Sequence, residues 1–280
     1  MPIVLLEHPR PRIPERYESV VNTPLSSCLM TGYVASTLKS NYHDVDIVDA
    51  NLYGWTFNKT IQELRKKSFK LLGVHLVYLW ENTASVFEML MDLRRSVPDA
   101  HINLYGHFPT FASRELLTNH PFVDSVTIGE PEATFLELSA AVTNNKDTSA
   151  LYTIDGIAFN YTNSKLEEGI LKPDVILNKP RKPVSNLDNL PFPYRNDFEL
   201  TKKKGISTFI LASRGCYGKC TFCYLDNFYG EESSWRGRST ENVFNEIYDI
   251  YEEFDERYFY FADANFFGPG KKGKERACEL

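Results

Sequence analysis

The stretch ISTFILASRGCYGKCTFCYLDNFYG, residues 206–230, joins an apolar run to a loop that holds three of the chain's five cysteines. Residues 206–213 are rich in β-branched and aromatic side chains, which predicts a buried strand. Cys216, Cys220 and Cys223 follow its carboxyl end with the spacing C-x3-C-x2-C. Three soft thiolates in one short loop can close on a single metal centre. In a four-iron cluster they would leave one iron without a protein ligand, open to a small molecule.

The sequence after the cysteine loop predicts a helix and a second strand. Residues 240–254 are amphipathic, with Ser239 or Thr240 as the N-cap. Residues 257–268, RYFYFADANFFG, predict a strand and its exit loop. A strand, loop, helix and strand in this order begin a β/α barrel, whose functional loops lie at the carboxyl ends of the strands. We therefore expect residues 205–280 to form the N-terminal portion of a β/α barrel.

The first half of the chain alternates between predicted strands and predicted helices at least four times. The predicted strands, such as residues 3–6 and 70–79, are near-continuous apolar runs. Such runs are typical of a parallel sheet that is covered on both faces. We therefore predict an α/β fold in which residues 1–145 form a doubly wound, Rossmann-like parallel-sheet domain. Residues 146–204, with a predicted hairpin and a proline-rich stretch, form the connection.

Ligands of doubly wound sheets bind beyond the carboxyl ends of the strands. The residues that follow the predicted third, fourth and fifth strands are therefore candidates for ligand contacts: Leu76, Tyr78, Gly106, His107, Gly129 and Glu130. Glycine at two of these ends would let a bulky ligand approach the backbone. No G-x-G-x-x-G motif follows the first strand, which argues against a dinucleotide site.

The composition narrows the function classes. The chain has 280 residues, of which 42% are hydrophobic, so a packed core is expected. A net charge of −6 argues against a nucleic-acid binder, which would usually carry a basic surplus. No secretory signal is visible, and the longest apolar run is too short to cross a bilayer. We expect a soluble, cytoplasmic protein without a disulfide framework, in which Cys28 and Cys278 are isolated thiols.

Several stretches together resemble one enzyme family. The three-cysteine motif, with the aromatic Phe222 before its last cysteine, is similar to the signature of radical S-adenosylmethionine enzymes. The chain also resembles the subclass in which a cobalamin-binding domain precedes the barrel. Besides the cysteine motif, six stretches carry this similarity: DVDIVDAN, NLYGHFPT, VDSVTIGEPEATFLEL, NLDNLPFPYRND, WRGRS and FADANFFGPGKKGKERA.

The resemblance implies a role for each candidate residue of the C-terminal part. The three cysteines would hold a [4Fe–4S] cluster whose open iron binds S-adenosylmethionine, and an electron donor such as flavodoxin or ferredoxin would supply the electron for its cleavage. Phe222 would pack near the adenine, and Asp263 and Asn265 would make polar contacts to S-adenosylmethionine. Arg236 and Arg238 are either cofactor contacts or surface charges. Without the resemblance, a zinc site whose fourth ligand is Cys278 or a histidine stays open.

The resemblance also implies that the N-terminal domain binds cobalamin. Asp49-x-Asn51-x-x-Gly54 is similar to the D-x-H-x-x-G loop that supplies a histidine to cobalt in some cobalamin proteins, but asparagine replaces the histidine. We therefore interpret Asp49 and Asn51 as turn residues. His75, inside a predicted buried strand, is interpreted as a hydrogen-bonded core histidine. His107 is better placed for ligand contact, and no lower cobalt ligand is identified.

The resemblance supports three functional hypotheses. The first is a methyltransferase that acts on an unactivated carbon or phosphorus centre of a small molecule. The second keeps the same cofactors but closes, contracts or oxidises a ring. The third is a truncated, non-catalytic cobalamin-binding fragment. Residues 206–280 would supply only about two and a half of the βα units of a barrel, at roughly 30 residues each. We therefore expect the chain to be a fragment or one half of a split enzyme.

Overall fold

The structure is a computed structural model of the chain. It describes residues 3–10, 29–76, 83–143, 148–161, 174–195, 197–230 and 235–280. The chain divides into two compact units, of which unit 1 comprises Met1–Thr23 and Thr37–Arg181 and unit 2 comprises Pro24–Ser36 and Lys182–Leu280. Among the described residues, no helix is long and apolar enough to span a membrane.

Unit 1 contains a seven-stranded sheet with the strand order β2-β1-β3-β4-β5-β6-β7. Its strands are β1 (Ile3–Glu7), β2 (Val45–Asp49), β3 (Leu71–His75), β4 (His101–Tyr105), β5 (Ser125–Thr127), β6 (Ile157–Tyr161) and β7 (Asp174–Leu177). Strands β1 to β5 pair in parallel, and β6 and β7 add an antiparallel hairpin beside β5. The mostly parallel α/β sheet confirms the predicted fold class. The hairpin that the sequence places in the connection extends this sheet.

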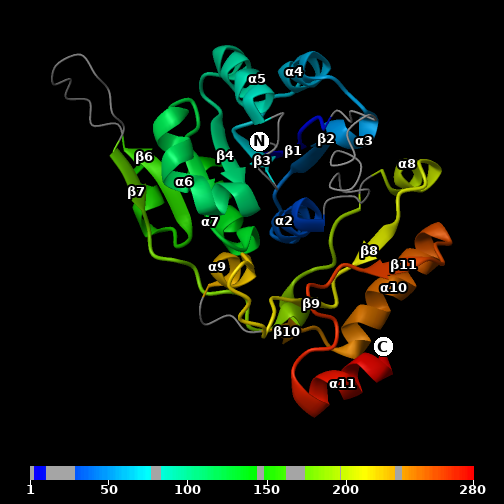
Figure 1. Cartoon of the computed structure of the whole chain (residues 1–280). Coiled ribbons are helices and arrows are strands. Elements are labelled where there is room, and N and C mark those ends of the chain that lie inside the picture. Colours follow the sequence, from blue (N-terminus) through cyan, green and yellow to red (C-terminus); the bar gives the residue numbers. More distant parts are fainter. Residues whose placement is uncertain are drawn as a thin grey trace. The chain divides into compact units, whose positions relative to one another are not determined.

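Helices follow the parallel strands in chain order and pack around the sheet (Figure 1). They are α3 (Ala50–Tyr53), α4 (Phe57–Arg65), α5 (Thr83–Ser96), α6 (His107–Asn119), α7 (Pro131–Thr143) and the 3-10 turn η1 (Thr148–Thr153). Helix α2 (Leu29–Ser40) lies between β1 and β2 in the chain and contributes residues to both units. Asp49 caps α3, because its carboxylate accepts a hydrogen bond from the backbone N–H of Leu52 at 2.7 Å. Its capping role agrees with the turn interpretation.

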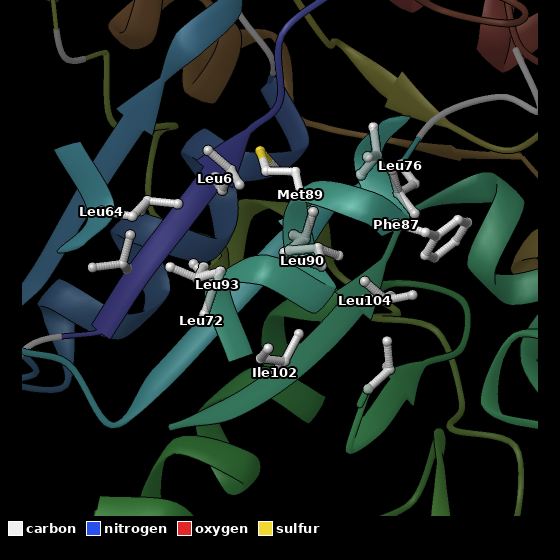
Figure 2. Packing of buried hydrophobic residues seen from close by; sticks show 14 of the residues in the cluster. Leu6, Leu64, Leu72, Leu76, Phe87, Met89, Leu90, Leu93, Ile102 and Leu104 are labelled. Carbon is white, nitrogen blue, oxygen red and sulfur yellow. The ribbon is translucent and has the colours of Figure 1, made fainter. Parts of the chain in front are cut away.

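The two faces of the sheet pack against different helices. Met89, Leu90 and Leu93 of α5 lie over the side chains of neighbouring strands, among them Leu72 and Ile102 (Figure 2). The opposite face packs against α7: a Cβ on Gly73 would lie only 2.8 Å from the ring of Phe135, so glycine makes room for this ring. Both faces are buried, which explains why the strands are continuous apolar runs.

Unit 2 is built around one parallel strand–helix–strand unit. Strand β8 (Thr208–Ile210) pairs in parallel with β11 (Phe259–Phe261), and α10 (Thr240–Phe254) connects them along the chain. The remaining elements are η2 (Leu187–Asn189), α8 (Phe198–Lys203), β9 (Ser213–Arg214), α9 (Leu225–Tyr229), β10 (Arg236–Gly237) and α11 (Gly270–Glu279). A buried apolar cluster, centred on Ile210, Val243 and Ile250, holds α10 against β8. This is the order of elements predicted from residues 206–268.

Helix α10 begins with a side-chain cap. Ser239 has extended backbone angles, and its hydroxyl accepts a hydrogen bond from the backbone N–H of Asn242 at 3.1 Å. Ser239→Ala is expected to lower the free energy of unfolding by about 1 kcal/mol, because one N–H of the first turn loses its acceptor. Urea unfolding followed by circular dichroism measures the change. Ser239→Thr keeps an acceptor oxygen and is the control; equal losses in both variants would contradict the cap.

Candidate cofactor sites

The cysteine loop follows β9 directly. A Cβ on Gly218 would lie 3.4 Å from the Sγ of Cys216 and 3.8 Å from the Sγ of Cys220, so these two sulfurs flank the glycine. The backbone N–H of Gly218 points at the Sγ of Cys216, 3.3 Å away. Cys223 follows a turn in which its own N–H bonds to the carbonyl of Cys220 at 3.0 Å. The loop therefore brings Cys216 and Cys220 together and places Cys223 one turn further along.

The donor chemistry of this loop fits an iron–sulfur cluster. Cys216 and Cys223 are half-buried and Cys220 is exposed, and none of the three forms a disulfide. Three thiolates without a neighbouring carboxylate or imidazole are the ligands that iron–sulfur clusters use. In the described part of the chain, no three His, Cys, Asp or Glu side chains form a group that could hold a metal ion as they stand. Cys278, the candidate fourth ligand of a zinc site, is exposed on α11.

Two candidate polar residues lie beside the cysteine loop. Asp263 accepts a hydrogen bond from the backbone N–H of Ala212 at 3.1 Å and another from the hydroxyl of Ser213. Burial raises the pKa of the Asp263 carboxyl, although these two donors oppose the shift. Asn265 donates from its amide to the Sγ of Cys216 at 4.0 Å. The structure therefore places Asp263 against the start of β9, and Asn265 against the first cysteine.

Arg238 is not a surface charge. It is 4% exposed, and its guanidinium bonds to the carbonyl of Leu211 at 2.9 Å and to the Asn242 side chain at 2.6 Å. It also forms an ion pair with the carboxylate of Glu246. The surface-charge alternative was wrong for this residue because its long side chain turns inward. Arg238 instead joins α10 to the carbonyl of Leu211, just after β8, and its contact with a cofactor stays a prediction.

Arg236 and Phe222 have different surroundings. Arg236 is half-buried; its guanidinium donates to the carbonyl of Val184 at 2.5 Å and lies over the ring of Tyr229, 5.2 Å from its centroid. The ring of Phe222 is 91% exposed. Its packing against an adenine stays a prediction.

At the carboxyl edge of the sheet in unit 1, the candidate residues of three strands are linked. The backbone N–H of Leu76 bonds to the carbonyl of Tyr105 at 2.9 Å. The hydroxyl of Thr110 donates to the carbonyl of Gly106 at 2.8 Å and accepts from the N–H of Gly129 at 3.1 Å. The structure thus brings together Leu76, Gly106 and Gly129, as the strand order predicts. Tyr78 lies outside the described residues.

A buried histidine and a buried carboxylate lie in contact at the same edge. The Nδ1 atom of His75 is 2.9 Å from a carboxylate oxygen of Glu7, and both side chains are almost fully buried. The ring of His75 also lies 5.1 Å from that of Tyr105. This agrees with the interpretation of His75 as a hydrogen-bonded core histidine. Sequence reasoning missed Glu7, because the end of a buried apolar strand carries no signal for a partner 68 residues away.

His107 begins α6, and Glu130 precedes α7. Burial lowers the pKa of His107 to about 4, and the neighbouring His75 adds to this shift. Glu130 is 8% exposed, so little of its side chain reaches solvent. A histidine with this pKa is neutral at pH 7, and neutral imidazole is the form that binds metals or accepts hydrogen bonds. Direct contact of these two side chains with a ligand stays a prediction.

The low pKa of His107 predicts acid sensitivity. The unfolded chain protonates His107 near pH 6.5, whereas the folded chain protonates it near pH 4. Because the unfolded state binds more protons in this window, stability present above pH 6.5 is lost as the pH falls toward 4. We expect His107→Gln to lose less stability than the parent chain between pH 7.5 and 4.5, by about 2 kcal/mol. Urea unfolding at both pH values measures the difference; equal losses would contradict burial of a neutral imidazole.

The two units define a class of protein. An open, mostly parallel α/β sheet is followed by a strand–helix–strand unit whose first strand leads into a three-cysteine loop. The carboxyl edge of the sheet brings the ends of three strands together, and the loop holds three cysteines. No protein-family model matches the chain.

Comparisons with known proteins confirm the resemblance to cobalamin-dependent radical S-adenosylmethionine enzymes. The chain is 28% identical over 272 residues to the anaerobic magnesium-protoporphyrin IX monomethyl ester cyclase of Synechocystis, covering 95% of this chain and 50% of that protein. It is 23% identical over 278 residues to the cytidylyl-2-hydroxyethylphosphonate methyltransferase of Streptomyces wedmorensis, covering 84% and 50%. The chain thus spans about half the length of these relatives.

Solved structures share the fold. The cobalamin-dependent S-adenosylmethionine radical enzyme OxsB, with aqua-cobalamin and S-adenosylmethionine bound, matches with a TM-score of 0.77 and 21% identity, over 99% of this chain and 36% of that one. The radical S-adenosylmethionine methyltransferase TsrM of Kitasatospora setae, with cobalamin and a [4Fe-4S] cluster bound, matches with a TM-score of 0.69 and 15% identity, over 95% and 49%. Both fold matches include both units.

Proposed function

We propose that this chain acts in a cobalamin-dependent radical S-adenosylmethionine enzyme that methylates an unactivated carbon or phosphorus centre of a small molecule. The observation that carries the proposal is the loop with Cys216, Cys220 and Cys223, which follows the first strand of a parallel strand–helix–strand unit. The fold shared with OxsB and TsrM supports it, as does the identity to a phosphonate methyltransferase. The proposal concerns the whole enzyme, of which this chain supplies these two units.

The residues of unit 2 have distinct proposed roles. Cys216, Cys220 and Cys223 would hold a [4Fe–4S] cluster as thiolates. When bound, this cluster supplies one electron that cleaves S-adenosylmethionine reductively. The N–H of Gly218 orients the Cys216 sulfur, and Asp263 offers a half-buried carboxyl for a polar contact to S-adenosylmethionine. A flavodoxin or ferredoxin is the proposed electron donor.

The carboxyl edge of unit 1 is the proposed cobalamin site. Ligands of open α/β sheets bind beyond the carboxyl ends of the strands, and OxsB, which shares the fold, has aqua-cobalamin bound. Gly106 and Gly129 lie at these strand ends, both with positive φ. The missing side chain of Gly106 makes room for the carbonyl of Leu76 and the ring of His75, so this glycine lets the strand ends pack closely. The carboxylate of Glu7 at this edge contacts both His75 and Arg10, so it has partners within the protein. We assign no side chain of this chain as a lower cobalt ligand.

Anaerobic reconstitution tests the proposal. The chain is incubated with ferrous iron, sulfide and hydroxocobalamin and then desalted, and iron and corrinoid are quantified with ultraviolet–visible spectra. We expect about four irons per chain together with retained corrinoid. Alanine at Cys216, Cys220 and Cys223 should abolish iron binding but leave corrinoid bound, because the cysteines belong to unit 2.

Cys278→Ala is the matched control, because this exposed thiol lies outside the motif. It should keep the full iron content. Bound zinc in place of iron, or an iron content that falls equally in the Cys278 variant, would overturn the cluster assignment. A chain that binds iron but retains no corrinoid would overturn the cobalamin assignment alone.

A ring-closing reaction with the same cofactors is the second candidate. The identity to the cyclase of Synechocystis, 28% over 95% of this chain, favours it over an unrelated chemistry. Product mass separates the two reactions, because methyl transfer adds one CH2 to the substrate and ring closure does not. Formation of 5′-deoxyadenosine without any methylated product would favour the cyclase reaction.

A further inference from the structure

The sulfur of Cys216 faces two N–H donors. Among the described residues, no N–H donor contacts the sulfur of Cys220 or Cys223. The backbone N–H of Gly218 lies 3.3 Å from the Cys216 Sγ, and the side-chain amide of Asn265 lies 4.0 Å from it. The first donor belongs to the cysteine loop itself. The second comes from the loop after β11, 49 residues further along the chain. The three cysteines therefore have unequal surroundings.

The backbone of Asn265, which carries this amide, is held in place by hydrogen bonds. The backbone carbonyl of Asn265 accepts a hydrogen bond from the indole N–H of Trp235 at 2.6 Å and another from the hydroxyl of Ser213 at 3.3 Å. The indole ring is itself enclosed: a Cβ on Gly237 or Gly268 would lie 2.4 Å or 2.7 Å from it. These contacts fix the position of residue 265 without using its side-chain amide, so the amide is left to face the sulfur.

We propose that Asn265 is a positioning residue for Cys216: its amide stabilises negative charge on this one sulfur, and thereby tunes the cluster that the three cysteines hold. Its donor faces Cys216, and the S-adenosylmethionine contact that the sequence predicts for Asn265 stays a prediction. Hydrogen bonds to ligating sulfurs withdraw electron density and raise the reduction potential of iron–sulfur clusters. The effect on the cluster rests on the proposed function, but the contact with Cys216 does not.

The contact is tested first in the metal-free chain. Alkylation by iodoacetamide at pH 7, below the ordinary thiol pKa of about 8.5, is followed by peptide mass spectrometry, which gives separate rates for Cys216, Cys220 and Cys223. Asn265→Leu removes the donor at similar volume and should slow alkylation of Cys216 about two- to threefold, because the loss of one hydrogen bond disfavours the reactive thiolate and is only partly offset by higher nucleophilicity. The other two cysteines are internal controls and should change little.

Two further variants sharpen this test. Asn265→Asp has nearly the same shape but places an acceptor against the sulfur, so it should slow Cys216 at least as much. Phe267→Ala changes an exposed ring in the same loop and should leave all three rates unchanged. Equal changes at all three cysteines, or an unchanged rate at Cys216, would overturn the proposal.

The effect of Asn265 on the reduction potential of the cluster is tested in the cluster-loaded chain by a redox titration, which is followed by electron paramagnetic resonance. Asn265→Leu and Asn265→Asp should lower the midpoint potential at an iron content equal to that of the parent chain. If the parent chain takes up no iron, the proposed function fails, and the alkylation rates still decide the role of Asn265. If iron binds and neither rates nor potential respond, only the role of Asn265 is overturned.

Discussion

Replacing Glu246 by leucine is expected to lower the free energy of unfolding by about 3–5 kcal/mol. Glu246 lies on α10 and is 1% exposed. One carboxylate oxygen is 2.8 Å from the guanidinium of Arg195, and the other pairs with that of Arg238. Both arginine side chains are also buried. Leucine would leave two guanidinium groups in the interior of unit 2 without a counter-charge, and breaking a buried pair from one side is costly.

Urea unfolding followed by tryptophan fluorescence measures this loss, since Trp235 reports on unit 2. Glu253→Leu is the matched control, because Glu253 is exposed on the same helix; its effect should stay within about 0.5 kcal/mol. Added salt should not restore the Glu246 variant, because buried pairs are little screened. A Glu246→Leu variant as stable as the parent chain would refute the buried arrangement.

Gly106→Ala is the second change with a large expected effect, a loss of about 3 kcal/mol or more. Gly106 has a φ of +111°, where side chains are strained, and its added Cβ would lie 2.5 Å from the carbonyl oxygen of Leu76. The same Cβ would lie 2.8 Å from the ring of His75. The nearest atom belongs to the backbone of a central strand end, so no side-chain rotation relieves the overlap.

Gly54→Ala separates the cost of the positive φ from the cost of the steric overlap. Gly54 also has positive φ, +67°, but no atom lies within 4 Å of its added Cβ. It should therefore lose only about 1 kcal/mol, the cost of the backbone conformation alone. Thermal unfolding of both variants gives the comparison. If Gly106→Ala costs no more than Gly54→Ala, the close approach of the strand ends β3 and β4 is wrong.

Much of the architecture follows from local patterns. Continuous apolar runs predicted the parallel strands, and the amphipathic period predicted α5 and α10, because these signals depend on neighbours a few residues away. The cap at Ser239 and the cysteine spacing are local in the same sense. The antiparallel hairpin of β6 and β7 was foreseen as a hairpin but not as part of the sheet, since pairing with β5 is a long-range choice.

The candidate sites divide in the same way. The sequence by itself determined the positions of the three cysteines and of the strand ends, because the cysteine spacing and the order of the strands can be read directly from the sequence. Only the tertiary structure decided the partners: Glu7 for His75, Glu246 for Arg195, and Asn265 for Cys216. These residues are 68, 51 and 49 positions apart. No periodicity links such positions; they meet because β-sheet pairing and helix packing bring distant segments together, and burial then requires each charge or donor to find a partner.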